Sequence, residues 1–198
     1  IPVALPGSSV TAPLTYSALN TNATTNVADL AIGAVTGATF DLTLRTGGVA
    51  GAEISGSSVS GVGTLTITHS GGATFSGAVN TTTVTLTNTI GTIAFNGALT
   101  ATTLNTAAQA YNVALNATSG TITNAVTFSN TGTLALGASG GTLAFNGGLT
   151  ATAPSASTLK GTITSSNDAM SFGPITLGAN TTLNTVATTN VADLSIGA

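Results

Sequence analysis

The sequence predicts an all-β fold, a parallel β-helix (β-solenoid) with rungs of roughly 20 residues and a long repeat of about 164 residues. Three observations indicate this fold class: a composition that favours strands, short apolar triplets separated by turn residues, and segments that recur at fixed offsets. Together they predict a single continuous solenoid segment over residues 1–198 rather than separate globular domains.

The composition is far from that of an ordinary globular protein. Only 4% of the 198 residues are charged, against about 25% in typical domains, and about a fifth are threonine. A hydrophobic content of 42% with a net charge of −3 is the opposite of the pattern of disordered chains. Threonine, valine, isoleucine and phenylalanine favour strands, while the helix formers glutamate, lysine, arginine and methionine are scarce.

Short strands are predicted from a recurring triplet with an apolar, a small or polar, and another apolar residue. Because side chains alternate along a strand, the outer two residues of a triplet face inward and the middle one outward. Segments such as "NTIGT" and "GASGG" between the triplets have turn chemistry. The triplets begin at Leu30, Phe40, Leu65, Val84, Ile93, Val113, Val126, Leu134, Leu143, Ile175 and Leu194.

Repeats occur at two length scales. "GGATFSGAVNTTTV" (Gly71–Val84) aligns without gaps on "GTIAFNGALTATTL" (Gly91–Leu104) at an offset of 20, and "GTLAFNGGLTAT" (Gly141–Thr152) aligns on the latter at an offset of 50. "TTNVADLAIGA" (Thr24–Ala34) returns as "TTNVADLSIGA" (Thr188–Ala198), an offset of 164. Residues 20–34 and 184–198 are therefore expected to hold equivalent positions in successive long repeats.

The repeats decide between two β architectures. An antiparallel sandwich also has short, regularly spaced strands, but it does not predict that aligned residues recur with the same inward or outward phase. In a solenoid, corresponding residues stack directly above one another. At about 4.8 Å per rung, a repeat of roughly eight rungs would be about 40 Å long, and we expect the sequence after Ala198 to continue like "VTGATFDLTLR".

The six phenylalanines are predicted to form the structural core, because each follows a small residue or threonine and precedes a small or polar residue. Their irregular spacing predicts rungs of unequal length. Turn asparagines such as Asn26 and Asn190 are candidates for side-chain ladders between rungs. The predicted core residues are Phe40, Phe75, Phe95, Phe128, Phe145 and Phe172.

No catalytic, cofactor-binding or metal-binding residue is predicted. Each carboxylate is isolated in sequence and is expected in a turn or facing outward, and His69 is expected inward or at a corner. One histidine without cysteine provides neither a zinc site nor a catalytic triad. The calcium-binding repeat needs an aspartate in each copy, and the repeats of this chain have none in register. The carboxylates are Asp29, Asp41, Glu53, Asp168 and Asp193.

Other binding classes receive little support from the sequence. Two basic residues, Arg45 and Lys160, do not make a nucleic-acid footprint, and no apolar stretch is long enough to span a membrane as a helix. The glycosylation sequons at Asn22, Asn80, Asn116 and Asn180 occur as often as chance predicts. A glycan surface would need exposed aromatic residues, and only Tyr16 and Tyr111 are candidates outside the core phenylalanines.

Alternating threonines mark one possible binding face. Thr64–Thr68 and Thr81–Thr89 place hydroxyl groups along one outward side, which resembles the flat face of β-solenoid ice-binding proteins. The gap-free neighbouring rung has Thr103 and Asn105, so the array is expected to fade there. Threonine is also simply a good outward strand residue in a protein of low charge.

The pattern in "GTIAFNGALTATTL" (Gly91–Leu104) resembles the strand repeats of large secreted bacterial proteins. These are the filamentous-haemagglutinin and autotransporter-passenger type and the giant repeat proteins of cell surfaces and sheaths. The resemblance implies a right-handed parallel β-helix, export, and a role in adhesion or extracellular fibres. It carries no catalytic residue to this chain, and the secretion and cap domains of that family have no counterpart in these residues.

The sequence therefore predicts a structural protein at an extracellular or cell-surface location, and not an enzyme. We expect a segment of a filament, sheath or surface fibre whose partner is itself, through end-to-end or lateral association. An adhesin that binds a glycan or cell-surface partner along one side is the alternative. A polysaccharide-lyase-type enzyme shares the fold, but two basic residues are too few for its groove.

Overall fold

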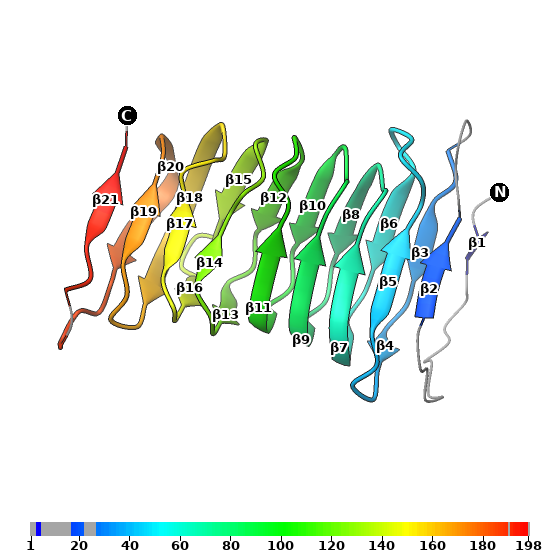
Figure 1. The fold of residues 1–198 in the computed structure, drawn as a ribbon, viewed down its shortest axis with the longest axis horizontal. Helices are drawn as coiled ribbons and strands as arrows, with labels where there is room; N and C mark the ends of the chain where they lie inside the picture. Colours follow the sequence, from blue (N-terminus) through cyan, green and yellow to red (C-terminus); the bar gives the residue numbers. More distant parts are fainter. Residues whose placement is uncertain (1–2, 5–16, 22–26, 190, 198) are drawn as a thin grey trace.

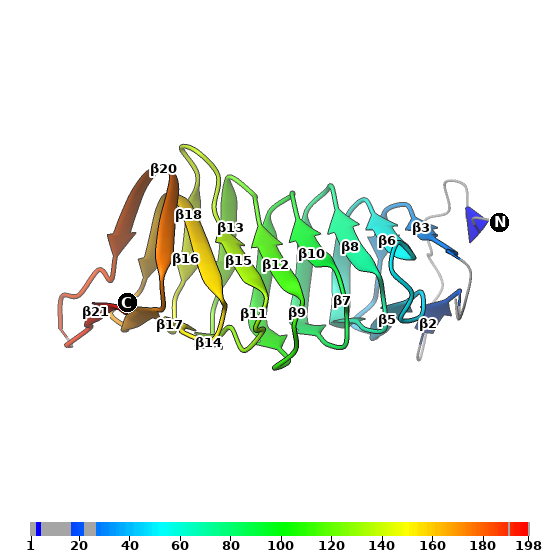
Figure 2. The ribbon, with the colours of Figure 1, turned by 90° about the horizontal axis from the view of Figure 1, so that it is seen from above.

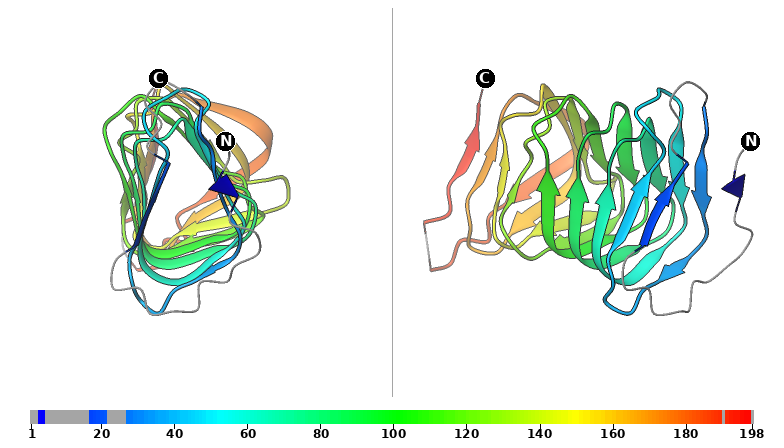
Figure 3. Two further views of the ribbon diagram at one scale, coloured as in Figure 1. Left: turned by 90° about the vertical axis from the view of Figure 1, so that its right-hand side faces the viewer. Right: turned by 45° about the vertical axis from the view of Figure 1, so that its right-hand side comes forward.

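The computed structural model describes residues 3–4, 17–21, 27–189 and 191–197. In these residues every paired strand is parallel to its partners, and there is no helix. The chain winds around one long axis as a prism with a roughly triangular cross-section, and its two termini lie at opposite ends (Figures 1 and 3). The predicted parallel β-solenoid is confirmed.

The prism has three sides, which we number in the order in which the chain visits them. Side 1 consists of strands that pair in one continuous column from one end to the other. Its strands are β1 (Val3–Ala4), β3 (Leu30–Ile32), β6 (Glu53–Gly56), β8 (Gly72–Phe75), β10 (Thr92–Phe95), β12 (Asn112–Leu115), β15 (Thr133–Leu136), and the first parts of β18 (Ala156–Ser165) and β20 (Ile175–Asn184).

Sides 2 and 3 share several long strands that bend around the corner between them. Side 2 consists of β4 (Val35–Thr36), the first parts of β7 (Val59–Ile67), β9 (Val79–Leu86) and β11 (Leu99–Thr106), then β13 (Ser119–Ile122), β16 (Thr142–Phe145), and the second parts of β18 and β20. Side 3 consists of β2 (Ser17–Asn20), β5 (Leu42–Arg45), the second parts of β7, β9 and β11, then β14 (Val126–Thr127), β17 (Leu149–Ala151), β19 (Met170–Phe172) and β21 (Leu194–Ile196).

Register partners give the length of each rung. On side 1 the inward positions follow one another as Leu30, Ile54, Ala73, Ile93, Val113, Leu134, Ser157 and Ile175. The differences between these numbers are 24, 19, 20, 20, 21, 23 and 18, so the rungs vary around the predicted length. The offset of 20 is a true rung repeat, because Phe95 pairs with Phe75 and Leu104 with Val84.

Close stacking explains why glycine marks the corners of this rung repeat. A Cβ atom on Gly91 would collide with the carbonyl oxygen of Gly71, and one on Gly97 would collide with the backbone of Gly77. Side chains at these positions would therefore push successive corners apart. The glycines let consecutive rungs stay at strand-pairing distance all the way around the prism.

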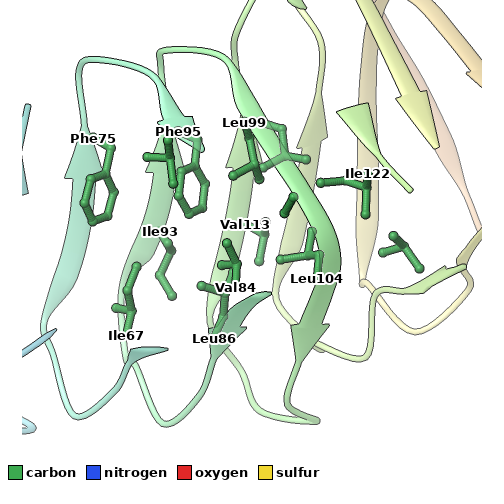
Figure 4. Packing of buried hydrophobic residues seen from close by; sticks show 14 of the residues in the cluster. Ile67, Phe75, Val84, Leu86, Ile93, Phe95, Leu99, Leu104, Val113 and Ile122 are labelled. Carbon is green, nitrogen blue, oxygen red and sulfur yellow. The ribbon is translucent and has the colours of Figure 1, made fainter. Parts of the chain in front are cut away.

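The interior is one apolar column of inward-facing side chains (Figure 4). Five of the six predicted core phenylalanines are buried: Phe75, Phe95, Phe128, Phe145 and Phe172. The rings of Phe75 and Phe95 stack with centroids 5.4 Å apart, and those of Phe128 and Phe145 meet edge to face at 6.1 Å. Each buried ring contributes several kcal/mol, roughly the 3–5 kcal/mol that its truncation to alanine costs.

Phe40 differs from the other five phenylalanines. It is only partly buried and lies before β5, which begins at Leu42, so its triplet is not a strand from the start. The preceding residue, Thr39, has a φ of 69°, so the chain adopts a left-handed conformation directly before Phe40. Leu42 of this triplet is buried and begins the strand, whereas Phe40 is neither in the strand nor fully buried.

The long repeat does not return to the same side of the prism. In the first copy Leu19 lies on side 3 and Leu30 on side 1, whereas their counterparts Leu183 and Leu194 lie on sides 2 and 3. From β2 the chain passes side 3 seven more times, up to β19, and then advances two sides to the end of β20. The long repeat therefore corresponds to seven and two-thirds turns.

The offset of 50 behaves in the same way. Phe95 lies in β10 on side 1, but its counterpart Phe145 lies in β16 on side 2. Corresponding residues keep their inward or outward phase at all three offsets, yet they stack in one column only at the offset of 20. Leu30 and Leu194, which are equivalent in the long repeat, therefore lie on different sides of the prism, because the rungs between them do not add up to whole turns.

Candidate functional site

Two of the carboxylates accept hydrogen bonds from backbone amides of the next rung. Asp29 Oδ1 accepts a hydrogen bond from the Glu53 amide at 3.0 Å, and Asp41 Oδ1 accepts one from the Thr64 amide at 2.7 Å. Both aspartates precede a strand and are exposed; the sequence predicted a turn or an outward-facing position for them. Among the described residues there is no group of three or more histidine, cysteine, aspartate or glutamate side chains that could hold a metal ion.

His69 lies at the corner between sides 3 and 1, one of its two predicted places. It and Asn88 occupy the same corner of successive rungs, with φ angles of 46° and 44°. Its Nε2 atom lies 2.5 Å from Asn88 Nδ2, and its Nδ1 atom lies 2.9 Å from Thr68 Oγ1. Beneath them, the buried hydroxyls of Ser70 and Thr89 are 3.0 Å apart. Both ring nitrogens of His69 thus contact polar side chains of the corner.

Tyr111 is a structural residue that the sequence did not identify. Its side chain is buried, its hydroxyl donates a hydrogen bond to the Leu86 carbonyl at 2.9 Å, and it accepts one from the Ala107 amide at 2.9 Å. Burial raises the pKa of this phenol to about 12. Tyr16 lies outside the described residues, and no tyrosine or phenylalanine side chain in the described part of the chain is fully exposed. An aromatic platform for sugars is therefore not found there.

Ladders of polar side chains connect neighbouring rungs on side 1. Asn112 donates to Thr92 Oγ1 at 3.3 Å, and its Oδ1 accepts hydrogen bonds from the Thr133 amide and hydroxyl at 2.8 and 3.0 Å. Asn116 donates to Asn96 Oδ1 at 3.1 Å. The predicted ladder at Asn26 and Asn190 falls on residues outside the described part of the chain.

The threonine array on side 3 is longer than the sequence comparison indicated. Toward the C-terminal end it stops at Asn105, as expected. Toward the N-terminal end one outward column continues through Thr85, Thr66 and Thr43. A second column contains Thr103, Thr83 and Thr64. This side therefore presents two parallel rows of hydroxyl groups over at least three rungs.

A hollow with a volume of about 320 Å³ lies at the corner between sides 2 and 3. Hydroxyl and amide groups line most of it, and no titratable side chain does. The lining residues are Thr39, Gly61, Val62, Asn80, Thr81, Thr82 and Thr102. Such a surface can offer hydrogen bonds to a neutral ligand.

Exposed apolar side chains gather at the C-terminal end. Leu177 is 62% exposed, Leu194 is 45% and Ile196 is 50%. They lie in β20 and β21, at the opposite end of the solenoid from β1 to β3 (Figures 1 and 2). We call the last rung, consisting of β20 and β21, the open rung. Its strand edges have no further strand beyond them among the described residues.

The strands at this end carry no charge. Their inward side chains are apolar except for Thr181, and no lysine or arginine lies in β20 or β21, although charged residues are the common protection of sheet edges. The described residues also contain no helix long and apolar enough to cross a membrane.

No protein-family model, curated protein or solved structure matches this chain.

Proposed function

We propose that this protein is a structural segment of an extracellular filament, sheath or surface fibre that associates with itself by stacking rung upon rung. The mechanism is mechanical rather than chemical. Backbone hydrogen bonds join each rung to the next, while the inward residues extend one apolar column through the interface. Threonine, serine and asparagine cover the outside of the assembled fibre.

The open rung is the observation that carries this proposal. Leu194 and Ile196 are about half exposed, whereas the same residues of the first copy, Leu30 and Ile32, are 2% and 9% exposed beneath β6. Removing apolar surface from water contributes about 25 cal/mol for each Å². A further rung at this end would bury the open rung as β6 buries β3.

Assembly of the purified chain tests the proposal. We expect sedimentation velocity to show growth with increasing protein concentration, and electron microscopy to show unbranched filaments. Because stacked strands are about 4.8 Å apart, power spectra of the filaments should contain a layer line near that spacing. Discrete particles at every concentration would contradict the proposal.

A pair of variants locates the interface. The double substitution Leu194→Lys and Ile196→Lys places charges on the inward face of the open rung, and we expect it to abolish growth. The double substitution Thr43→Lys and Thr85→Lys is the charge-matched control, because both residues lie on the outward face of covered strands on side 3, away from this end. Filaments of the first double variant that are indistinguishable from the wild type would show that association does not use this end.

A second candidate is a surface adhesin that binds a glycan along one side. The hollow between sides 2 and 3, with its lining of Thr39, Asn80, Thr82 and Thr102, favours it because neutral sugars are recognised by hydrogen bonds to such groups. Binding of the chain to immobilised glycans is the test. A glycan ligand should be lost in Asn80→Leu and retained in Asn180→Leu, a distant exposed site; equal loss would exclude the hollow.

A further inference from the structure

The open rung has a covered equivalent inside the same chain. In the first copy, β2 is covered by β5 with Leu19 opposite Leu44, and β3 is covered by β6 with Leu30 opposite Ile54. The second copy keeps the same apolar residues, Leu183 in β20 and Leu194 and Ile196 in β21. The strands that fit on the first copy therefore have the side-chain pattern needed to fit on the second.

The polar contacts of the first copy also have counterparts in the second copy. The Asp29 carboxylate receives the Glu53 amide of the covering strand, and Asp193 has the corresponding place in front of β21. The outward residue of the strand is small in both copies, Ala31 and Ser195, so neither obstructs a neighbouring strand. The carboxylate that accepts the backbone amide and the apolar column of the first interface thus both have counterparts at the open rung.

We propose that the open rung is a docking surface for a second copy of residues 35–56, and that this copy docks turned by one side of the prism. This inference rests on the proposed function. The copy of β4 lies over the first part of β20 on side 1, the copy of β5 over its second part on side 2, and the copy of β6 over β21 on side 3. In the first repeat these three strands lie on sides 2, 3 and 1.

The rotation follows from the seven and two-thirds turns of the long repeat. Each further repeat would start one side away from the preceding one, so three repeats would complete 23 turns. A surface group such as Arg45, on side 3 of one repeat, would appear on side 2 of the next. A fibre of such repeats would offer the same lateral contacts on all three sides, which a repeat of whole turns would confine to one side.

Disulfide trapping tests the docking and its rotation together. The chain has no cysteine, so engineered cysteines are the only thiols. The full chain is extended after Ala198 by a second copy of residues 35–56, with cysteine replacing the appended copy of Ser55. A second cysteine replaces either Ser195 on side 3 or Thr176 on side 1. Register neighbours in adjacent strands are about 4.8 Å apart, within the range of about 4.4–6.8 Å that a disulfide spans.

The turned arrangement predicts a disulfide with Ser195→Cys and about tenfold less with Thr176→Cys. The pair Ala31→Cys and Ser55→Cys in the unextended chain is the positive control, since these residues are register neighbours. A disulfide with Thr176→Cys alone would overturn the rotation, and failure of both pairs while the control forms would overturn the docking. In either case, filament growth of the unextended chain tests the proposed function independently.

Discussion

Two segments of almost the same sequence have opposite surroundings in this molecule. Residues 27–33 and 191–197 differ only at Ala31 and Ser195, and both contain a short strand with two inward apolar residues. The strand of the first segment is buried and that of the second is about half exposed. Both strands follow the same aspartate and lie next to another strand on one edge, so local conformation is not what separates them.

The difference is one covering rung. β3 has β6 on its C-terminal side, while β21 has no strand there among the described residues. In a solenoid each rung contacts only its neighbours, so burial is a property of the stack and not of the segment. The comparison teaches that the apolar pattern of a rung specifies an interface on both of its edges, whether or not each interface is occupied.

The largest expected effect comes from truncating the matched leucines. Leu30→Ala should lower the free energy of unfolding by about 2–5 kcal/mol, because it leaves a cavity in a packed core. Leu194→Ala should cost less than about 1.5 kcal/mol, since its side chain is already about half exposed. Urea unfolding followed by circular dichroism, at concentrations where the chain is monomeric, measures both. Equal losses would mean that β21 is covered in solution.

The buried phenol of Tyr111 extends the comparison to the fully covered middle of the stack. Its pKa is raised to about 12 in the folded state by burial, against about 10 in the unfolded chain. The contribution of this phenol to stability should therefore be constant below pH 10 and fall as the pH rises from about 10 to 12, because the unfolded state releases the proton first. Thermal unfolding at increasing pH measures the fall.

Tyr111→Phe is the control for this titration. It should lower the free energy of unfolding by about 1 kcal/mol at neutral pH, because the two hydrogen bonds of the hydroxyl are lost while the Ala107 amide and the Leu86 carbonyl still bond each other at 3.0 Å. The variant should also lack the part of the fall in stability between pH 10 and pH 12 that ionisation of the phenol causes in the wild type. An unchanged alkaline profile in the variant would contradict the assignment.

The matched aspartates should show a smaller contrast. Asp29→Ala removes the acceptor of the Glu53 amide and should cost about 1 kcal/mol. Asp193→Ala has no covering strand to lose and should leave the free energy of unfolding nearly unchanged. In the chain extended by residues 35–56, Asp193→Ala should become as costly as Asp29→Ala. If it stays neutral there, the two aspartates do not have the same role.

The smallest effect is expected from exchanging the one residue that distinguishes the two segments. Either Ala31→Ser or Ser195→Ala alone makes the two segments identical, and both side chains lie on the outward face of a short strand. Each change should shift the free energy of unfolding by no more than about 0.5 kcal/mol. Hydrogen exchange of residues 30–32 should remain slower than that of residues 194–196, and a reversal would show that sequence, and not cover, separates the two.

Much of the fold could be predicted because it depends on local patterns. Triplets such as Ile93–Phe95 and Leu134–Leu136 are strands with their outer residues inward, and the offset of 20 is a register of paired strands. Phe40 was assigned to the core because its triplet matches the others. It is only partly buried and directly follows Thr39, whose left-handed conformation no apolar pattern records.

The candidate site was less predictable. End-to-end or lateral association was expected, but the sequence did not indicate which surface would serve it, because Leu177 and Ile196 carry the same pattern as buried residues elsewhere. Tyr111 could not be recognised as a buried anchor, because its partners at Leu86 and Ala107 depend on how two rungs meet. Longer threonine columns on side 3 were missed because the rung that joins Thr43 to Thr66 is longer than the repeat offset of 20.

The sequence by itself determined the strands, their inward and outward faces, the turn positions and the stacking of neighbouring rungs, since each depends on side-chain alternation and corner chemistry within one or two rungs. Only the tertiary structure decided on which side a repeated segment lies and whether it is covered. Because the rungs differ in length, the side on which a repeated segment lies depends on all the rungs before it, and no single motif determines it. Leu30 and Leu194 therefore have the same local sequence, the same strand conformation and the same inward direction. They differ in the side of the prism on which they lie and in their burial.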